Sequence, residues 1–242
     1  MDLVRDTFNT RLSDIESYFE LVNNIEKAIG SGGATLHIDG APYRISTTQQ
    51  KIMYSGIYLH LYNLVESTMM LLIDAVERHT SSSINNNVSL LTEKMKRLYV
   101  KSVAEPVDAT AVSPEKRLLK YLKLFDQVLG AHPVEIKIPQ GGGGNWGVQE
   151  IERISDKIGV TLNIDNEIYR LATVPLRDDK GPLRFIKDTR NKLAHGSISF
   201  AECGEYHVAS DFRHLINVVR DYLMEVINSY QAFIENNGFR LG

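Results

Sequence analysis

Apolar residues recur at helical spacing along most of the chain, and this pattern predicts an all-α protein. In residues 3–29 they return every three or four positions, and the polar, glycine-rich residues 30–33 end the predicted helix. Residues 48–79 carry two adjacent apolar stripes. A helix that is apolar over so much of its surface contacts partners on more than one side, so we predict that this helix is central.

Two further helices complete the predicted centre of the molecule. One begins near Pro182, and the other is a long C-terminal helix capped by Ser210 or Asp211. Together with the central helix they predict an all-α bundle. We predict a single domain over residues 1–242, in which residues 80–178 form an elaboration between the second helix and the Pro182 helix.

Shorter stretches predict small elements around this bundle. Residues 35–45 alternate between apolar and polar on either side of Asp39-Gly40, which is typical of a β-hairpin. Residues 198–209 alternate in a similar way and predict a second hairpin, and residues 134–138 predict a short strand. Helical periodicity predicts three more helices: residues 88–103, residues 113–130 and residues 148–158.

Composition narrows the class of protein. The chain has 242 residues, of which 43% are hydrophobic, enough to form a globular core. A single cysteine excludes an intramolecular disulfide and, with scattered histidines, a thiolate-rich zinc site. Residues 1–20 are amphipathic and carry acids rather than a targeting signal, and no apolar run is long enough to span a membrane. We therefore expect a soluble cytoplasmic protein without a cofactor.

Charge is unevenly distributed along the chain. The net charge of −3 argues against a general nucleic-acid coat protein. Lysine and arginine nevertheless gather in residues 94–123 and again in residues 170–192, and such local positive fields can guide a phosphate backbone. For the first of these stretches, solvated helix faces are the simpler interpretation. No carboxylate cluster suited to a two-metal nuclease is visible, so we expect no metal.

The most informative stretch is Arg190-Asn191-Lys192-Leu193-Ala194-His195-Gly196. Arg190 falls on the apolar stripe of its helix, where a guanidinium needs a partner or a site that uses it. Gly196 is placed to end the helix as a left-handed cap. Residues five apart point roughly 140° away from each other on a helix. Arg190 and His195 therefore converge only if the helix stops at Gly196 or if two copies of the stretch meet.

Three other residues suggest further interpretations. Glu66 lies among apolar neighbours in the central helix, and a carboxylate there usually needs a partner, so we hypothesise an ion pair with Arg190. His60 lies beside the apolar stripe of the same helix, and we interpret it as a core histidine. Trp146 offers a surface on which a base could stack, although a tryptophan more often caps a core.

An arginine, a polar residue, three further residues and a histidine resemble the signature of the HEPN superfamily. This is a group of all-helical domains, many of which are metal-independent ribonucleases. The surroundings resemble one bacterial branch, found with toxin–antitoxin and restriction-type defence genes. The segments that carry this likeness are Gly144-Asn145-Trp146, Lys157-Ile158-Gly159-Val160 and Ile198-Ser199-Phe200, and the resemblance extends from about Gln49 to the C-terminus.

This resemblance implies that RNA is cleaved by attack of its own 2′-hydroxyl, which leaves a 2′,3′-cyclic phosphate and a 5′-hydroxyl. His195 would transfer protons, Arg190 would stabilise charge on phosphorus, and Asn191 would orient His195 or the phosphate. Two such motifs usually meet across a homodimer, so a composite active site is expected. Candidate RNA contacts are Arg184, Lys187 and Lys192.

The resemblance leaves three interpretations open. The protein is either a ribonuclease that acts as a toxin or defence effector, or a non-catalytic HEPN scaffold or nucleotide-binding subunit. A third possibility is a subunit that acts only with an antitoxin or another defence-system partner. Cleavage of RNA by the pure protein distinguishes these interpretations.

Overall fold

The computed structural model describes residues 1–104, 113–129, 134–139 and 145–241. Within these residues the protein is 71% helical, with nine α-helices, one 3₁₀ turn and one small antiparallel hairpin. The predicted all-α fold with small β additions is therefore confirmed.

In chain order the elements are α1 (Asp2–Gly30), β1 (Thr35–Ile38), β2 (Ala41–Arg44), α2 (Thr47–Ser83), η1 (Val88–Leu90), α3 (Glu93–Ala104), α4 (Pro114–Val128), α5 (Val148–Ile158), α6 (Asn166–Thr173), α7 (Pro182–Ala194), α8 (Phe200–Cys203) and α9 (Ala209–Glu235).

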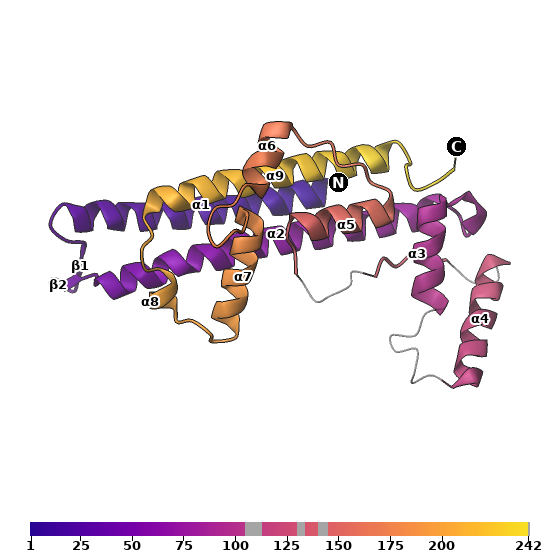
Figure 1. Ribbon diagram of the computed structural model, residues 1–242, viewed down its shortest axis with the longest axis horizontal. Helices are drawn as coiled ribbons and strands as arrows, with labels where there is room; N and C mark the ends of the chain where they lie inside the picture. Colours follow the sequence, from indigo (N-terminus) through magenta and orange to yellow (C-terminus); the bar gives the residue numbers. More distant parts are fainter. Residues whose placement is uncertain (105–112, 130–133, 140–144, 242) are drawn as a thin grey trace.

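Helix α2 is the centre of the bundle, as its two apolar stripes predict. It contacts α1, α7, α8 and α9, and Figure 1 shows α1 and α9 lying along it while α7 crosses it. Both stripes are buried, with Ile57 and Leu61 on one and Tyr58 and Tyr62 on the other. The helix begins with a capping box at Ser46, which fixes its first turn.

The small hairpin forms where the sequence predicts it. β1 and β2 pair antiparallel, with Ile38 opposite Ala41, and the chain turns at Asp39-Gly40. Both turn residues have positive φ, at 51° and 79°, which is the conformation that a two-residue hairpin turn requires.

Residues 198–209 do not form the second hairpin that their alternation predicts. Ser199 accepts a hydrogen bond from the backbone of Glu202, and the Glu202 carboxylate accepts one from the backbone of Ser199. This capping box starts the short helix α8. The last helix then begins at Ala209, slightly earlier than predicted, and Asp211 caps it from within its first turn by accepting from Val208 N.

Residues 134–138 alternate in burial as predicted, but they do not form a strand. Their backbone N–H groups bond to side chains at and beyond the end of α2 rather than to another strand. Val134 N donates to Asn86, Ile136 N donates to Ser81, and Ile138 N donates to Glu77. The segment is therefore an extended chain that three hydrogen bonds hold against α2 and the residues just after it.

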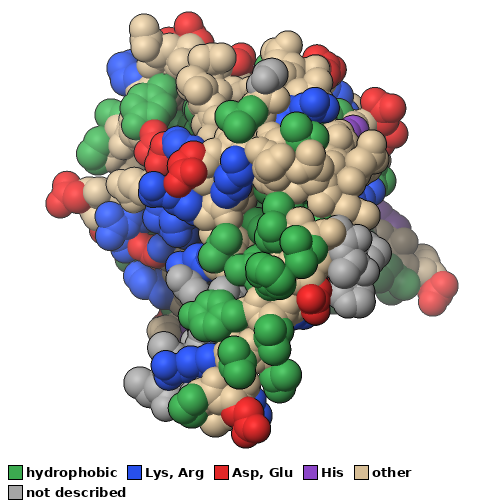
Figure 2. Space-filling model, turned by 90° about the vertical axis from the view of Figure 1, so that its right-hand side faces the viewer, with side chains coloured by type: hydrophobic (Ala, Val, Ile, Leu, Met, Phe, Trp, Pro, Cys, Tyr) green, Lys and Arg blue, Asp and Glu red, His purple; other side chains and the backbone are tan. Residues whose placement is uncertain are grey.

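Helix α4 lies at one end of the molecule and contacts α3. It starts at the predicted Ser113-Pro114 pair and ends at Val128, and the predicted endpoint Gly130 lies outside the described residues. Its apolar seam faces outward, and Figure 2 shows hydrophobic side chains gathered on this end of the molecule. The exposed large hydrophobic residues of α4 and the position after it are Leu118, Leu119, Tyr121, Leu122, Phe125, Val128 and Leu129. No helix in the described part of the chain is long and apolar enough to cross a membrane.

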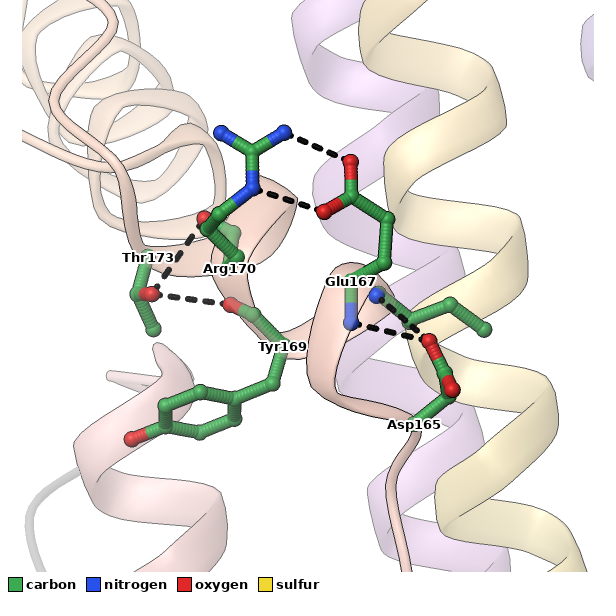
Figure 3. Close-up of polar contacts among 6 residues, drawn as sticks. Asp165, Glu167, Tyr169, Arg170 and Thr173 are labelled. Atoms are coloured by element: carbon green, nitrogen blue, oxygen red, sulfur yellow. Dashed lines mark hydrogen bonds and ion pairs between the residues drawn. The ribbon is translucent and has the colours of Figure 1, made fainter.

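Helix α6 leads into the segment that carries α7. Asp165 caps it by accepting hydrogen bonds from the next turn, at 2.8 Å from Glu167 N (Figure 3). Arg170 donates two hydrogen bonds to the Glu167 carboxylate, at 2.7 and 2.6 Å. The charge of Arg170 is therefore neutralised within α6 and adds little to the basic cluster around α7.

Helix α7 ends as predicted. Pro182 occupies its first turn, where its missing N–H costs nothing. At the other end, Gly196 has a φ of 67°, and Ser197 N donates to Lys192 O at 2.8 Å, which closes the last turn. His195 is therefore held at the C-cap, on a turn that reverses the chain toward α8.

Candidate functional site

Arg190 lies on the inner side of α7, where the sequence places it. Its guanidinium carbon is 4.2 Å from the centre of the Tyr62 ring, and its Nη2 is 3.5 Å from Glu66 Oε2. Tyr62 and Glu66 are four residues apart on α2, so they present the ring and the carboxylate on one face. The ion pair expected between Arg190 and Glu66 is present.

The surroundings of Arg190 hold the guanidinium without enclosing it. The side chains of Arg190 and Glu66 are 29% and 33% exposed, so solvent partly screens their attraction. Stacking on an aromatic ring adds about 0.5–2 kcal/mol. Arg190 Nη1 also donates to Asn191 Oδ1 at 3.0 Å. A guanidinium has five N–H donors, so donors remain for an anion at the open side.

The Asn145-Trp146 segment meets the arginine helix in space. Asn191 Nδ2 donates to Asn145 Oδ1 at 3.4 Å, which links segments 46 positions apart. Trp146 is 3% exposed and packs in the core, so it caps the core and offers no surface for a base. Gly144, the first residue of this segment, lies outside the described residues.

His195 is exposed at the end of α7. Among the described residues no hydrogen-bond or ion-pair partner is present for its ring. On a helix it points roughly 140° away from Arg190. The described residues show no hydrogen bond or ion pair between Arg190 and His195, while Asn191, four positions before His195, shares a face with it.

The three candidate RNA-contacting cations have different surroundings. Lys187 lies 3.2 Å from Asp188, which Lys180 also contacts at 2.8 Å. Burial raises the pKa of Asp188, but hydrogen bonds from the two lysines outweigh it, so the pKa is lowered and the carboxylate stays charged. The charge of Lys187 is therefore largely compensated.

Arg184 and Lys192 are both exposed, on different sides of α7. Arg184 lies within roughly 20° of Asn191 around the helix, so it shares a face with the motif. Lys192 lies roughly 200° from Arg190 and lines a cavity with residues of α8. No carboxylate of the described residues pairs with either side chain.

The interpretation of His60 as a core histidine is wrong. Its side chain is exposed, and its ring stacks against Tyr18 with 4.9 Å between ring centres. The position next to an apolar stripe misled the prediction, because α1 covers only part of this face. His60 lines an open cleft between α1 and α2 that also contains Glu66.

Sequence reasoning missed Tyr62 as part of the site. Its only sequence signal is its place four residues before Glu66, which puts both on one helix face. It also missed the cavity beyond α7, because the residues that line it come from several separate elements.

Comparison with known families agrees with this arrangement. A family model described as MAE_28990-like HEPN matches residues 2–239. The chain belongs to the HEPN superfamily. The match begins well before Gln49, so α1 and the hairpin are part of this HEPN fold. Comparison with curated proteins and with solved structures gave no match.

HEPN families are often associated with ribonuclease activity. In this HEPN chain, the described residues contain no group of three or more His, Cys, Asp or Glu side chains that could hold a metal ion. The chemistry that the visible site offers is that of a guanidinium, an amide and an imidazole.

Proposed function

We propose that this protein is a metal-independent endoribonuclease that produces 2′,3′-cyclic phosphate ends. The observation that carries the proposal is the setting of Arg190. Stacking on Tyr62 and pairing with Glu66 fix the guanidinium, yet it remains partly open to solvent beside Asn191. A fixed, accessible guanidinium suits the charge that develops on a phosphate during transfer.

The reaction needs one proton acceptor and one stabilising cation. The 2′-oxygen forms a bond to phosphorus while the bond from phosphorus to the 5′-oxygen breaks. His195 accepts the proton of the 2′-hydroxyl, and a proton returns from the imidazolium to the departing 5′-oxygen. An imidazole titrates near neutral pH and is suited to both steps.

Residues five apart on a helix point roughly 140° away from each other, and this geometry favours a composite site. In a homodimer, Arg190 of one copy faces a phosphate that is held against His195 of the other. Asn191 then orients either the imidazole or the phosphate, and Arg184 on the same face binds a neighbouring phosphate. A role as a toxin or defence effector, with or without a partner protein, is compatible with this activity.

A second candidate function is a non-catalytic HEPN scaffold or nucleotide-binding subunit. The same divergence supports it, since a structural arginine paired with Glu66 and an exposed histidine need no chemistry. Such a protein binds RNA or nucleotides without cutting RNA.

The test is incubation of pure protein with labelled single-stranded RNA and with its all-DNA counterpart, both in excess chelator. We expect the RNA alone to be cut, and Arg190→Ala and His195→Ala each to abolish cutting while circular dichroism stays unchanged. Activity that survives both substitutions, or that the chelator removes, overturns the proposal. Binding of RNA without cutting supports the scaffold.

A further inference from the structure

Two adjoining cavities lie on the side of α7 away from Arg190. Their volumes are about 400 and 270 Å³, which is near the lower end of the range of small-molecule sites. They share five lining residues: Tyr58, Arg177, Phe185, Tyr206 and His207. Nothing in the ribonuclease mechanism above uses these residues.

Two cations line the smaller cavity. Arg177 and Lys192 come from different segments, and neither pairs with a carboxylate of the described residues. Both act on the buried Cys203 thiol, which also lines this cavity. Burial raises the pKa of Cys203, and a hydrogen bond with Ser55 and the two nearby positive charges oppose this rise.

The acids around the same cavity are mostly engaged elsewhere. Glu205 forms an ion pair with Lys51 at 2.8 Å, and Glu202 accepts a hydrogen bond from Ser199 N at 2.8 Å. Glu202 stays charged, because hydrogen bonds from Ser199 lower its pKa, and Asp178 also lines the cavity. The cavity therefore carries both signs, and Arg177 and Lys192 are its two side chains that suit a phosphate.

The backbone holds Arg177 at the cavity in a tight turn. Asp178 and Asp179 have φ of 51° and 55°, and Lys180 N donates to Arg177 O at 2.9 Å. This is the geometry of a two-residue hairpin turn. Arg177 is thus presented by a defined turn immediately before α7.

Tyr206 supplies an aromatic surface at the mouth of both cavities. Its side chain is 87% exposed, and its φ is 64°, a conformation that costs energy for a residue with a side chain. A large ring held exposed on strained backbone is explained if the ring binds something. Successive bases of single-stranded nucleic acids stack on such rings.

The inner wall of the cavities is rigid. Tyr58 Oη and His207 Nε2 are 3.2 Å apart, and His207 Nδ1 is 3.8 Å from Asp211 Oδ2. The rings of Tyr58 and Phe185 pack edge to face with 5.7 Å between centres. Aromatic walls with fixed polar groups suit a flat heterocycle better than a flexible chain.

The smaller cavity is continuous with the catalytic turn. Lys192 and Ile198 both line it, and His195 lies midway between them in sequence. The hydrogen bond from Ser197 N to Lys192 O closes this turn. The cavity therefore lies beside the turn that carries His195.

We propose that the two cavities bind one nucleotide of the RNA substrate beside the scissile phosphate, with its base on Tyr206 and its phosphate on Arg177 and Lys192. This inference rests on the proposed function for the identity of the substrate. It assigns base stacking to Tyr206 and one phosphate contact to Arg177, both of which lie outside the Arg190–His195 motif.

The test measures binding separately from cleavage. In His195→Ala protein, with chelator present, the affinity for a labelled single-stranded RNA is compared before and after adding Tyr206→Asn or Arg177→Ala. Asparagine adopts positive φ readily, so Tyr206→Asn removes the ring without straining the fold. We expect each change to weaken binding about tenfold. The matched controls Tyr121→Asn and Arg78→Ala alter exposed residues far from the cavities in sequence, and they should leave the affinity unchanged.

A second arm uses adenosine 3′-monophosphate as the probe. We expect it to compete with RNA in His195→Ala protein and to lose affinity in the Tyr206→Asn variant of that protein. If the mononucleotide depends on Tyr206 while RNA affinity does not, the cavities bind a free nucleotide and the RNA subsite is overturned. Unchanged RNA affinity in both variants overturns it as well. Failure of wild-type protein to cut RNA overturns the proposed function alone, because these binding arms do not need cleavage.

Discussion

Arg190 is a partly buried cation that is held in place and still accessible. Its partners, Tyr62 and Glu66, come from one face of α2, and its neighbour Asn191 takes a third interaction. Each interaction is modest on its own. Together they reduce the number of side-chain conformers that the arginine must give up when it binds a phosphate.

Glu66 should position Arg190 rather than react. Glu66→Gln keeps the size of the side chain but removes the charge that pairs with the guanidinium. The pair is about one-third exposed, so its loss is worth about 1 kcal/mol, which corresponds to an approximately fivefold fall in kcat. Steady-state kinetics on RNA measures this, with Glu93→Gln, which breaks an exposed pair with Arg97, as the control. A wild-type kcat in Glu66→Gln would show that Glu66 does not position Arg190 for catalysis.

His207 should make folding stability depend on pH. Burial lowers its pKa from the usual 6.5, and Arg177 adds to the lowering, while Asp211 opposes it. The unfolded chain therefore binds the proton more readily than the folded chain. Stability is complete above about pH 6.5 and falls as the pH drops below this value toward the folded-state pKa. The neighbouring Tyr58 stays uncharged throughout this range, because burial raises its pKa.

Urea denaturation at pH 7 and at pH 5 tests this linkage. The wild-type protein should lose more unfolding free energy between the two pH values than His207→Gln does. Equal losses in the two proteins would show that His207 is not the group responsible.

At the scale of elements, long stretches of helical periodicity predicted the helices correctly, whereas two short alternating stretches predicted strands that do not form. The long stripes of α1, α2 and α9 extend over many turns, so only a helix satisfies them. Residues 134–138 alternate correctly, yet no neighbouring strand is available, and side chains take their N–H groups. In residues 198–209 the Ser199–Glu202 capping box outweighs the alternation. The outcome at residues 134–138 depends on what lies alongside and could not be foreseen, whereas the Ser199-x-x-Glu202 pattern is a helix-start signal that the sequence does contain.

Only part of the candidate site could be predicted from the sequence: the Arg190–Glu66 ion pair could, and the cavity beyond α7 could not. The pairing of Arg190 with Glu66 follows from two charged residues on apolar helix faces, which need each other wherever the helices cross. The cavity of Arg177, Tyr206 and His207 has no such signal. Its residues lie in a turn and in a connection between helices, and only the packing of α7, α8 and α9 brings them together.

The close packing of α8 on α2 gives a prediction at this scale. A Cβ at Gly204 would lie 2.0 Å from the backbone oxygen of Lys51, so Gly204→Ala must push the two elements apart. Overpacking of this kind costs about 1–3 kcal/mol. For a chain of this length each kcal/mol lowers Tm by about 2–4 °C. Thermal melting should show this loss for Gly204→Ala but little change for Gly147→Ala, where nothing lies within 4 Å. Equal melting temperatures would contradict this packing.

At the scale of the whole molecule, HEPN membership places the Arg190–His195 motif within a fold that spans residues 2–239. Because residues five apart on a helix point in different directions, we propose that the site is built from two copies. Mixed dimers test this. Co-expression of Arg190→Ala and His195→Ala chains should restore about one quarter of wild-type activity, since half the dimers are mixed and each mixed dimer has one intact composite site. Mixed dimers without activity would contradict a composite site.

The central claim is that the 2′-hydroxyl of the RNA itself attacks the phosphate. The most direct measurement uses a single-stranded RNA with one 2′-deoxy nucleotide, placed on the 5′ side of a bond that the wild-type protein cuts, in excess chelator. We expect that this bond is no longer cut while other bonds still give 2′,3′-cyclic phosphate ends. Cutting at the 2′-deoxy position would show that another nucleophile acts, and it would contradict the mechanism.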